Sequence, residues 1–299
     1  MKVIYSPRYH IDIGTHVFPT RKYQLLYDRL RASAAAVEFV EPEPAAWSDL
    51  ALVHTPEYLQ KVRSGEFDVE ELAQLEVPWS PEVVEGFRLM TGGTILAAQA
   101  AATDGARVIC HIGGGFHHAF ANHGEGFCLF NDVAVAIRVL LRDGSITRAA
   151  VVDLDVHHGN GTALIFENDP NVFTFSMHQQ HNYPAFKPRG SLDVGLPDAA
   201  GDGIYLDRLR PALDEVFAHS PHIVLYLAGA DPYRDDQLGG LSLSKAGLRE
   251  RDRSVLRACA IHKIPVVVVL AGGYARKIED TVDIHGATIT EAALIQQRS

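Results

Sequence analysis

The sequence predicts an α/β fold with three layers, α/β/α, around a central and mostly parallel sheet. Short runs of β-branched residues, such as VVVVL at 266–270, are almost continuously apolar, which is typical of strands buried on both faces of a parallel sheet. Alanine-rich stretches with helical character separate these runs, and such alternation places helices on both faces of the sheet. The 299 residues contain no repeat and no low-complexity linker, and this length suits one large domain or two ordinary ones.

The expected elements alternate along the chain. Apolar runs predict strands at residues 3–6, 107–112, 149–155, 172–176, 223–228 and 266–270. Stretches rich in alanine and leucine predict helices at residues 93–102, 131–141, 206–218 and 243–259. Asn131 or Asp132 stands at the start of the second of these helices, where a short polar side chain can accept a hydrogen bond from a free backbone N–H.

Composition narrows the class of protein. The formal net charge of −10 argues against general nucleic-acid binding, which needs a basic surface, and suits basic ligands such as lysine-rich peptides or polyamines. The three cysteines show no CxxC spacing and are too few for a disulfide framework. The N-terminus lacks the apolar core of a signal peptide, and no apolar run approaches a membrane span. We therefore expect a cytoplasmic protein.

Glycines, acids, histidines and a tyrosine follow four of the predicted strands. The sequences after these strands are GGGFHH, VHHGNG, GADPYRDDQLGG and AGGYAR. In a parallel sheet, ligands gather outside the carboxyl ends of the strands. The coincidence of four such loops predicts a functional site at one rim of the sheet.

The first part of this site has the character of a metal centre. Asp155 and His157 stand at alternate positions, with Asp153 just before them, and side chains at i and i+2 of an extended chain point to one side. Asp231 follows another buried strand and is the best candidate for a third ligand. Three protein ligands and an open position are typical of catalytic zinc, although one histidine and two carboxylates would also suit iron, cobalt or manganese.

The second part of the site has the character of an acid–base pair. GGGFHH supplies His117 and His118, and the loop lacks the GK[S/T] and GxGxxG patterns of phosphate-binding loops. Asp153 and Asn160 can each accept a hydrogen bond from one of these rings. A carboxylate favours a charged imidazole and a neutral amide does not, so we expect the histidine paired with Asn160 to act as the base. The Tyr274 hydroxyl could stabilise an oxyanion.

Five motifs in order along nearly the whole chain resemble the zinc-dependent histone deacetylase family of the arginase/deacetylase superfamily. These are HIGGGFHH, GEGFCLFND, DLDVHHGNGT, GADPYRDDQLGGLSLS and LAGGY. The compact chain, with TGGT before the first motif and LGGLSLS after Asp231, is most similar to the class IV branch and its bacterial relatives. The resemblance implies the superfamily's fold, a single catalytic domain over 1–299, and one zinc ion held by Asp155, His157 and Asp231.

The resemblance also implies roles around that ion. His117 and His118 would be the tandem pair, with Asp153 behind His117 and Asn160 behind His118, and Tyr274 would bind the acyl carbonyl. Members of the family also bind structural potassium. The substrate tunnel and the potassium site would be formed by further residues: Gly115, Phe127 and Phe186 in the tunnel, and the backbone around Asp153, Asp155 and His157 with Ser176 and Met177 at the potassium.

Some positions depart from the family pattern. Asn160 stands where some classes have aspartate, and Lys22 takes the place of an arginine in an internal channel. Glu76 replaces an aspartate that holds the substrate backbone. Leu238 stands where polyamine deacetylases carry a glutamate that selects a cationic amine. His158, which adjoins the metal motif, is expected to be structural.

These residues predict hydrolysis of N-acyl-lysine amides in a protein or peptide, with His118 taking a proton from water, Tyr274 holding the oxyanion and His117 acting as an electrostatic partner. An acetylpolyamine or other small-molecule deacetylase is the main alternative. A dinuclear manganese hydrolase of the arginase type would leave the tandem histidines without a role. A binding module without activity is disfavoured because no expected group is missing. We expect no direct contact with nucleic acid.

Overall fold

The computed structural model describes residues 1–33, 37–103, 105 and 107–298. Within this part of the chain, eight strands form one sheet in the order β2-β1-β3-β8-β7-β4-β5-β6. All neighbouring strands are parallel, which confirms the predicted parallel sheet. The strands are β1 (Lys2–Ile4), β2 (Glu38–Val40), β3 (Val108–His111), β4 (Ala149–Asp153), β5 (Val172–Gln179), β6 (Leu192–Leu196), β7 (Val224–Leu227) and β8 (Val266–Val269).

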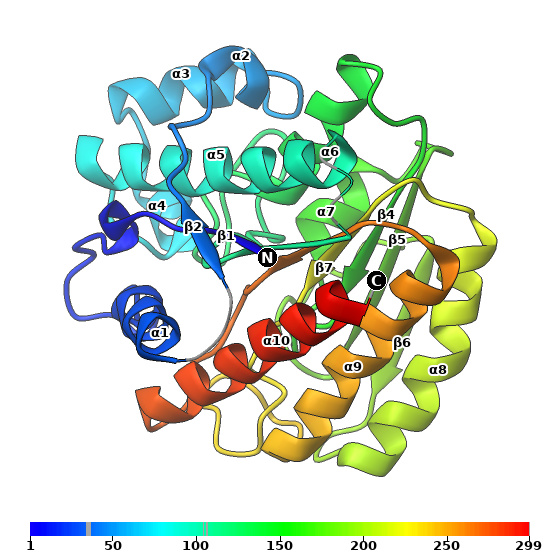
Figure 1. Ribbon diagram of the computed structural model, residues 1–299. Coiled ribbons are helices and arrows are strands. Elements are labelled where there is room, and N and C mark those ends of the chain that lie inside the picture. The colour runs from blue at the N-terminus through cyan, green and yellow to red at the C-terminus, as the bar shows by residue number, and fades with distance from the viewer. Residues whose placement is uncertain (34–36, 104, 106, 299) are drawn as a thin grey trace.

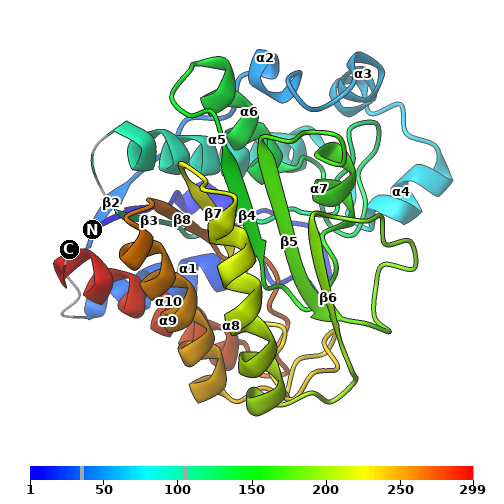
Figure 2. The same cartoon turned by 90° about the vertical axis from the view of Figure 1, so that its right-hand side faces the viewer.

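Helices cover both faces of the sheet (Figures 1 and 2). Helices α5 and α6 pack together on one face, and α1, α8, α9 and α10 cover the other. The helices are η1 (Pro7–Tyr9), α1 (Arg21–Ala32), α2 (Trp47–Leu50), α3 (Pro56–Ser64), α4 (Val69–Leu75), α5 (Pro81–Thr103), α6 (Asp132–Arg142), α7 (Asn160–Ile165), α8 (Asp202–Ala218), α9 (Lys245–His262) and α10 (Ile278–Arg298). None of these described helices is both long enough and apolar enough to cross a membrane.

The six predicted strands are all present, and the two that the sequence analysis missed lie at the edges of the sheet. Strand β2 has only three residues, and none of them is fully buried. Strand β6 alternates exposed and half-buried positions along LDVGL before its buried last residue. Edge strands lack the continuous apolar character by which buried parallel strands are found. The core strands β3, β4, β7 and β8 are buried throughout.

The helix predicted at 93–102 begins twelve residues earlier, at Pro81. Gly92 and Gly93 lie inside α5, although glycine is unfavourable in a helix interior. In the structure, a Cβ on Gly93 would lie 2.3 Å from the Tyr9 hydroxyl and 2.4 Å from His111 Nε2. This glycine therefore permits the close packing of α5 on the sheet. The predicted cap of α6 is confirmed, since the Asn131 side chain accepts a hydrogen bond from the Ala134 N–H at 3.0 Å.

The loops with functional character follow four strands that are direct neighbours in the sheet. Strands β3, β8, β7 and β4 lie side by side in that order. Because these strands are parallel, their carboxyl ends share one rim. The strand order thus explains how residues 117, 155, 231 and 274 meet, although they are far apart in the sequence.

Candidate active site

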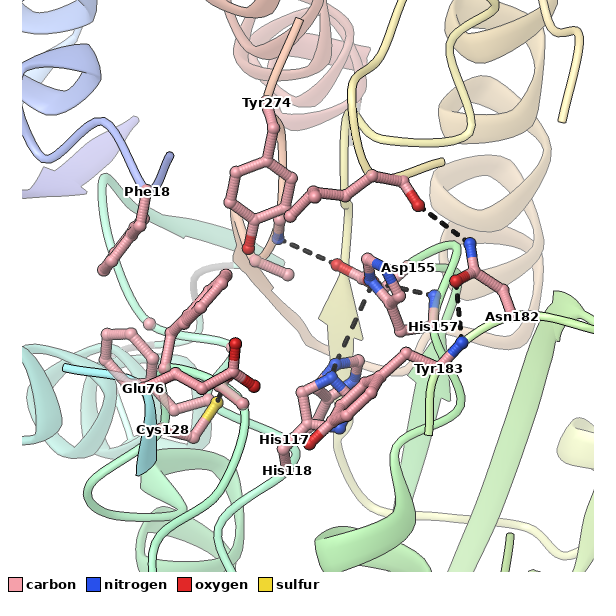
Figure 3. A pocket seen from close by; sticks show the side chains of 18 of the residues that line it. Phe18, Glu76, His117, His118, Cys128, Asp155, His157, Asn182, Tyr183 and Tyr274 are labelled. Carbon is pink, nitrogen blue, oxygen red and sulfur yellow. Dashed lines mark hydrogen bonds and ion pairs between the residues drawn. The ribbon is translucent and has the colours of Figure 1, made fainter. Parts of the chain in front are cut away.

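A pocket of about 760 Å³, counted to its open mouth, lies at this rim (Figure 3). Most of the predicted site residues line it, together with residues that the sequence analysis did not select. Its lining comprises Phe18, Tyr23, Glu76, Gly114, Gly115, Phe116, His117, His118, Gly126, Phe127, Cys128, Asp155, His157, Asn182, Tyr183, Leu238, Ala271, Gly272 and Tyr274.

Asp155, His157 and Asp231 form a buried group at the base of the pocket. One possible ligand atom from each residue lies within 4.8 Å of the others. Backbone N–H groups hold the carboxylates, since Gly272 N–H donates to Asp155 Oδ2 at 2.8 Å and Val156 N–H donates to Asp231 Oδ1 at 2.9 Å. Only glycine fits at position 272, because a Cβ there would lie 1.9 Å from Asp231 Oδ2.

The chemistry of this group fits a divalent cation. Asp231 Oδ2 is buried and accepts no hydrogen bond from the described residues, although it lies 3.5 Å from His157 Nδ1. Burial and the neighbouring charge of Asp155 raise the pKa of Asp231 to about 7. Burial alone would lower the pKa of His157, but the two carboxylates raise it to about 10. A buried carboxylate oxygen without a partner is costly, and a bound cation would satisfy it.

The two adjacent histidines form a hydrogen-bonded chain with their predicted partners. His117 Nδ1 lies 2.6 Å from Asp153 Oδ2, and His118 Nδ1 lies 2.7 Å from Asn160 Oδ1. The two Nε2 atoms are 3.1 Å apart, so one hydrogen lies between them. Because Asn160 presents an acceptor, His118 Nδ1 carries a hydrogen, and a neutral His118 has an unprotonated Nε2. The hydrogen between the rings then belongs to His117.

The surroundings separate the pKa values of these two rings. Burial alone would lower the pKa of His117, but the carboxylates of Asp153 and Asp155 raise it above its usual value. Burial and the charges of His117 and His157 hold the pKa of His118 well below its usual value. These directions agree with the expectation that the histidine beside Asn160 is neutral. Two groups with separated pKa values are typical of an acid–base site.

A buried carboxylate anchors the loop that carries the histidines. Asp132, the first residue of α6, accepts hydrogen bonds from the N–H groups of Gly115 at 3.0 Å and Phe116 at 2.8 Å. Gly115 has a φ of +86° and a Cβ there would lie 2.7 Å from Ala271 Cα. The glycines therefore let this loop turn tightly against the loop after β8.

Tyr274 lies across the pocket from the histidines, and its hydroxyl points into the pocket (Figure 3). Its backbone N–H donates to Asp236 Oδ2 at 2.7 Å, and its ring packs edge-to-face against Phe18 and Phe127. Burial and the nearby carboxylates hold its pKa well above 10.0. The phenol therefore keeps its proton and can donate a hydrogen bond.

Aromatic rings form the walls of the pocket, and one of them differs from the prediction. Phe127 lies parallel to Phe18 with ring centroids 6.1 Å apart. The expectation that Phe186 forms the other wall does not agree with the structure: its side chain is 62% exposed and is absent from the pocket lining. Tyr183 forms this wall instead, edge-on to His118 at 4.9 Å between centroids. Phe186 lies three residues later, on the outside of the same loop.

The remaining predicted residues lie near the mouth or behind the pocket. Glu76 and Leu238 line the pocket. The side chain of Asn182, which precedes Tyr183 in the pocket wall, donates a hydrogen bond to the Leu238 carbonyl at 2.8 Å. Lys22 is buried behind Tyr274 and donates to the Ala271 carbonyl at 2.9 Å; burial lowers its pKa to about 8. His158 lies outside the pocket and contacts Asp193 at 3.1 Å.

Phe18, Tyr23, Asn182 and Tyr183 line the pocket but were not predicted from the sequence. Phe18 and Tyr23 come from the N-terminal segment, whose sequence carries no metal or acid–base signal. Asn182 and Tyr183 follow β5, so the rule that ligands gather at the carboxyl ends of strands could have found them. An aromatic residue next to proline within that loop was the available signal.

The chain is similar to several known proteins. The family model described as histone deacetylase domain matches residues 16–288. An uncharacterized protein of Picosynechococcus sp. is 40% identical and covers 95% of both chains. Histone deacetylase 2 of Arabidopsis thaliana is 32% identical over 100% of this chain and 81% of its own length. The acetoin utilization protein AcuC of Bacillus subtilis is 32% identical over 80% of this chain and 68% of its own length.

A solved structure shares the fold. The crystal structure of the HDA15 HD domain superposes with a TM-score of 0.82 and covers 100% of this chain and 95% of that chain, at 22% identity. The all-parallel sheet with helices on both faces is thus the arginase/deacetylase fold predicted from the sequence. Together with the domain that spans most of the chain, these likenesses show that the protein belongs to the histone deacetylase family.

Proposed function

We propose that the protein is a zinc-dependent hydrolase of N-acyl-lysine amides. The observation that carries this proposal is the meeting of three groups at one pocket: a buried Asp-His-Asp cluster, a pair of histidines with separated pKa values, and a tyrosine hydroxyl. Hydrolysis of an amide needs a polarised carbonyl, a base for water and a donor for the oxyanion. Each group supplies one of these.

The metal would be held by Asp155, His157 and Asp231. Three protein ligands with an open fourth position are typical of catalytic zinc, which would polarise the acyl carbonyl and lower the pKa of a water towards ~7. The same ligand set would accept Fe²⁺. The potassium ion expected around Asp153 and Ser176 stays a prediction.

The chain's own residues would move the protons. The unprotonated Nε2 of His118, which accepts a hydrogen bond from His117 Nε2 in this structure, would take the proton of the attacking water. The Tyr274 hydroxyl would donate to the oxyanion that forms from the acyl carbonyl. His118, once protonated, would return the proton to the departing amine, because the leaving group is otherwise a strong base. His117, paired with Asp153, would stay cationic and stabilise the negative charge nearby.

The shape and lining of the pocket support an acyl-lysine substrate. The aromatic walls of Phe18, Phe127 and Tyr183 suit the aliphatic chain of lysine, which is long, flexible and apolar up to its amide. Leu238 adds an apolar group near the mouth. The net charge of −10 favours basic peptides.

One observation favours the alternative, an acetylpolyamine deacetylase. Glu76 places a carboxylate in the lining of the pocket, in a left-handed conformation with φ +62° at the end of α4. A carboxylate there can bind the second amine of a polyamine as well as the backbone N–H groups of a peptide. Partial burial raises the pKa of Glu76.

A direct comparison of substrates tests the proposal. The metal-loaded protein is assayed with lysine peptides that carry acetyl to myristoyl groups and with acetylspermidine. We expect kcat/KM for at least one peptide to exceed the value for acetylspermidine by about tenfold or more, since Leu238 near the mouth offers no charge to a second amine. A metal chelator should abolish turnover. A preference for acetylspermidine would favour the alternative, and turnover of neither substrate would contradict both.

Leu238 offers a more specific prediction about the mouth of the pocket. Leu238→Glu should raise the ratio of kcat/KM for acetylspermidine to that for acetyl-lysine peptide by about tenfold, because a partly buried ion pair with the distal amine contributes roughly 1–2 kcal/mol. Leu238→Gln is the matched control, with the same shape and no charge, and should leave the ratio nearly unchanged. Equal ratios in both variants would show that position 238 does not contact the distal part of the substrate.

A further inference from the structure

The turn that carries Phe127 also carries Glu125, whose charged side chain contacts Asn160, the partner of His118. Residues 125–128 form a tight turn in which the N–H of Cys128 donates to the carbonyl of Glu125 at 2.9 Å. Gly126 and Phe127 both have positive φ, +53° and +67°. A Cβ on Gly126 would lie 2.8 Å from His118 Cδ2. The turn is therefore packed directly against the ring of the proposed base.

The Glu125 carboxylate accepts hydrogen bonds from three residues that are distant from this turn in the sequence. Its Oε1 accepts from Asn160 Nδ2 at 2.7 Å and from the Tyr183 hydroxyl at 2.9 Å. Its Oε2 accepts from Gln74 Nε2 at 2.9 Å. The side chain is only 13% exposed. These hydrogen bonds, with one from His123, lower the pKa of Glu125 to about 2 even though partial burial alone would raise it.

We propose that Glu125 is a positioning residue that orients the Asn160 amide and thereby selects the tautomer of His118. This inference rests on the proposed function, because it concerns the base of that reaction. An ionised carboxylate can only accept hydrogen bonds. The NH₂ group of Asn160 must therefore face Glu125, and its oxygen must face His118. His118 then carries its hydrogen on Nδ1, and its unprotonated Nε2 accepts the hydrogen bond from His117 Nε2 at 3.1 Å.

The hydrogen-bonded chain is complete from one carboxylate to the other. It runs from Asp153 through His117, His118 and Asn160 to Glu125, with successive distances of 2.6, 3.1, 2.7 and 2.7 Å. His117 donates on both sides, His118 and Asn160 each accept on one side and donate on the other, and the two terminal carboxylates only accept. Reversing the Asn160 amide would therefore place its NH₂ group against the His118 donor and its oxygen against the Glu125 carboxylate. Such a mismatch leaves buried polar groups unsatisfied.

The same geometry accounts for an asparagine, and not an aspartate, at position 160. An aspartate there would place a second carboxylate 2.7 Å from Oε1 of Glu125, with no cation between them. Two carboxylates at that distance repel each other strongly. Residues 125 and 160 are therefore coupled, and their substitutions should not be additive.

The coupling between residues 125 and 160 predicts a pattern of kcat changes among variants that a purely structural role would not produce. Glu125→Ala should lower kcat about tenfold, with KM within about twofold, which is the size of one charge-assisted hydrogen bond. Glu125→Gln should keep most of the activity, because its carbonyl oxygen still accepts from Asn160. Asn160→Asp should lower kcat by about tenfold or more beside Glu125. The double variant Glu125→Gln with Asn160→Asp should recover about tenfold over Asn160→Asp, because the glutamine NH₂ can donate to the new carboxylate.

Gln74→Ala is the matched control. It removes a hydrogen bond from the other oxygen of the same carboxylate and does not reach Asn160, so kcat should stay within about twofold of the wild-type value. Melting temperatures of all variants separate loss of fold from loss of orientation. If Glu125→Ala keeps wild-type kcat, or if Glu125→Gln does not improve Asn160→Asp, the positioning role is wrong.

A measurement on the histidine itself does not depend on turnover. Side-chain ¹⁵N spectra of the metal-loaded protein should show His118 with a hydrogen on Nδ1 and none on Nε2, and Glu125→Ala should give a mixture of tautomers. An unchanged tautomer in active enzyme would overturn the positioning role and leave the proposed function standing. The expected tautomers in a protein that hydrolyses no acyl-lysine peptide would support the positioning role and contradict the proposed function.

Discussion

Tyr274→Phe is expected to lower kcat on an acyl-lysine peptide about 10²–10³-fold, the usual cost of removing one oxyanion donor. The substitution removes only the hydroxyl. The backbone N–H still donates to Asp236 at 2.7 Å, and the ring keeps its contacts with Phe18 and Phe127. Because the hydroxyl would bind the oxyanion more strongly than the ground-state carbonyl, kcat should change far more than KM.

Tyr205→Phe is the matched control for this variant. Tyr205 is a buried tyrosine of α8 that lies outside the pocket lining, and its hydroxyl has no hydrogen-bond partner among the described residues. Its loss should leave kcat within about twofold of the wild-type value. Metal content and melting temperature should be unchanged in Tyr274→Phe. A Tyr274→Phe enzyme with near wild-type kcat would remove the tyrosine from the mechanism.

Much of the site could be predicted because its chemistry follows buried strands. Asp155, His157 and Asp231 stood out as polar residues after apolar runs, and the neighbouring order of β3, β8, β7 and β4 brings their loops together. The partners of the two histidines also followed from residue types, because a carboxylate and an amide act differently on an imidazole. The structure brings these residues together as the sequence analysis expected.

The rest depended on information that no local pattern contains. Phe186 and Tyr183 lie in the same loop, and which of them faces the pocket depends on the path of the backbone after β5. Glu125 contacts residues from α4, α7 and the loop after β5, so its role is visible only once these segments are packed. The edge strands β2 and β6 were missed because exposed positions interrupt their apolar pattern.

Asp231→Asn is expected to abolish activity and at the same time not to destabilise the metal-free protein. Loss of one of three ligands should reduce bound metal from one ion per chain to a small fraction. Without the metal, the reaction loses several kcal/mol of transition-state stabilisation, which lowers the rate about 10³-fold or more. The asparagine oxygen can still accept from the Val156 N–H, as Asp231 Oδ1 does at 2.9 Å. The amide therefore replaces a carboxylate without breaking that bond.

The effect on the metal-free protein follows from the charge that is removed. Burial and Asp155 raise the pKa of Asp231 to about 7 from 3.8. A carboxyl group whose pKa is raised by folding contributes stability below pH 3.8, and this contribution is lost as the pH rises through 7. At pH 8 the metal-free wild type therefore holds a buried carboxylate next to Asp155, whereas the variant holds a neutral amide at the same position. We expect the metal-free variant to melt at the same temperature as the metal-free wild type or higher.

Thermal melts with added zinc or with chelator, alongside metal analysis, measure both effects. Zinc should raise the melting temperature of the wild type, because a ligand that binds only the folded state stabilises it, and should leave Asp231→Asn nearly unchanged. Asp236→Asn is the control for loss of a neighbouring buried carboxylate. Asp236 accepts backbone N–H bonds from Leu238, Gly239 and Tyr274, so that variant should lose stability and keep its metal. In Asp231→Asn the replaced oxygen is the one proposed to face the cation, whereas in Asp236→Asn it faces backbone N–H groups. A full complement of metal in Asp231→Asn would exclude Asp231 as a ligand.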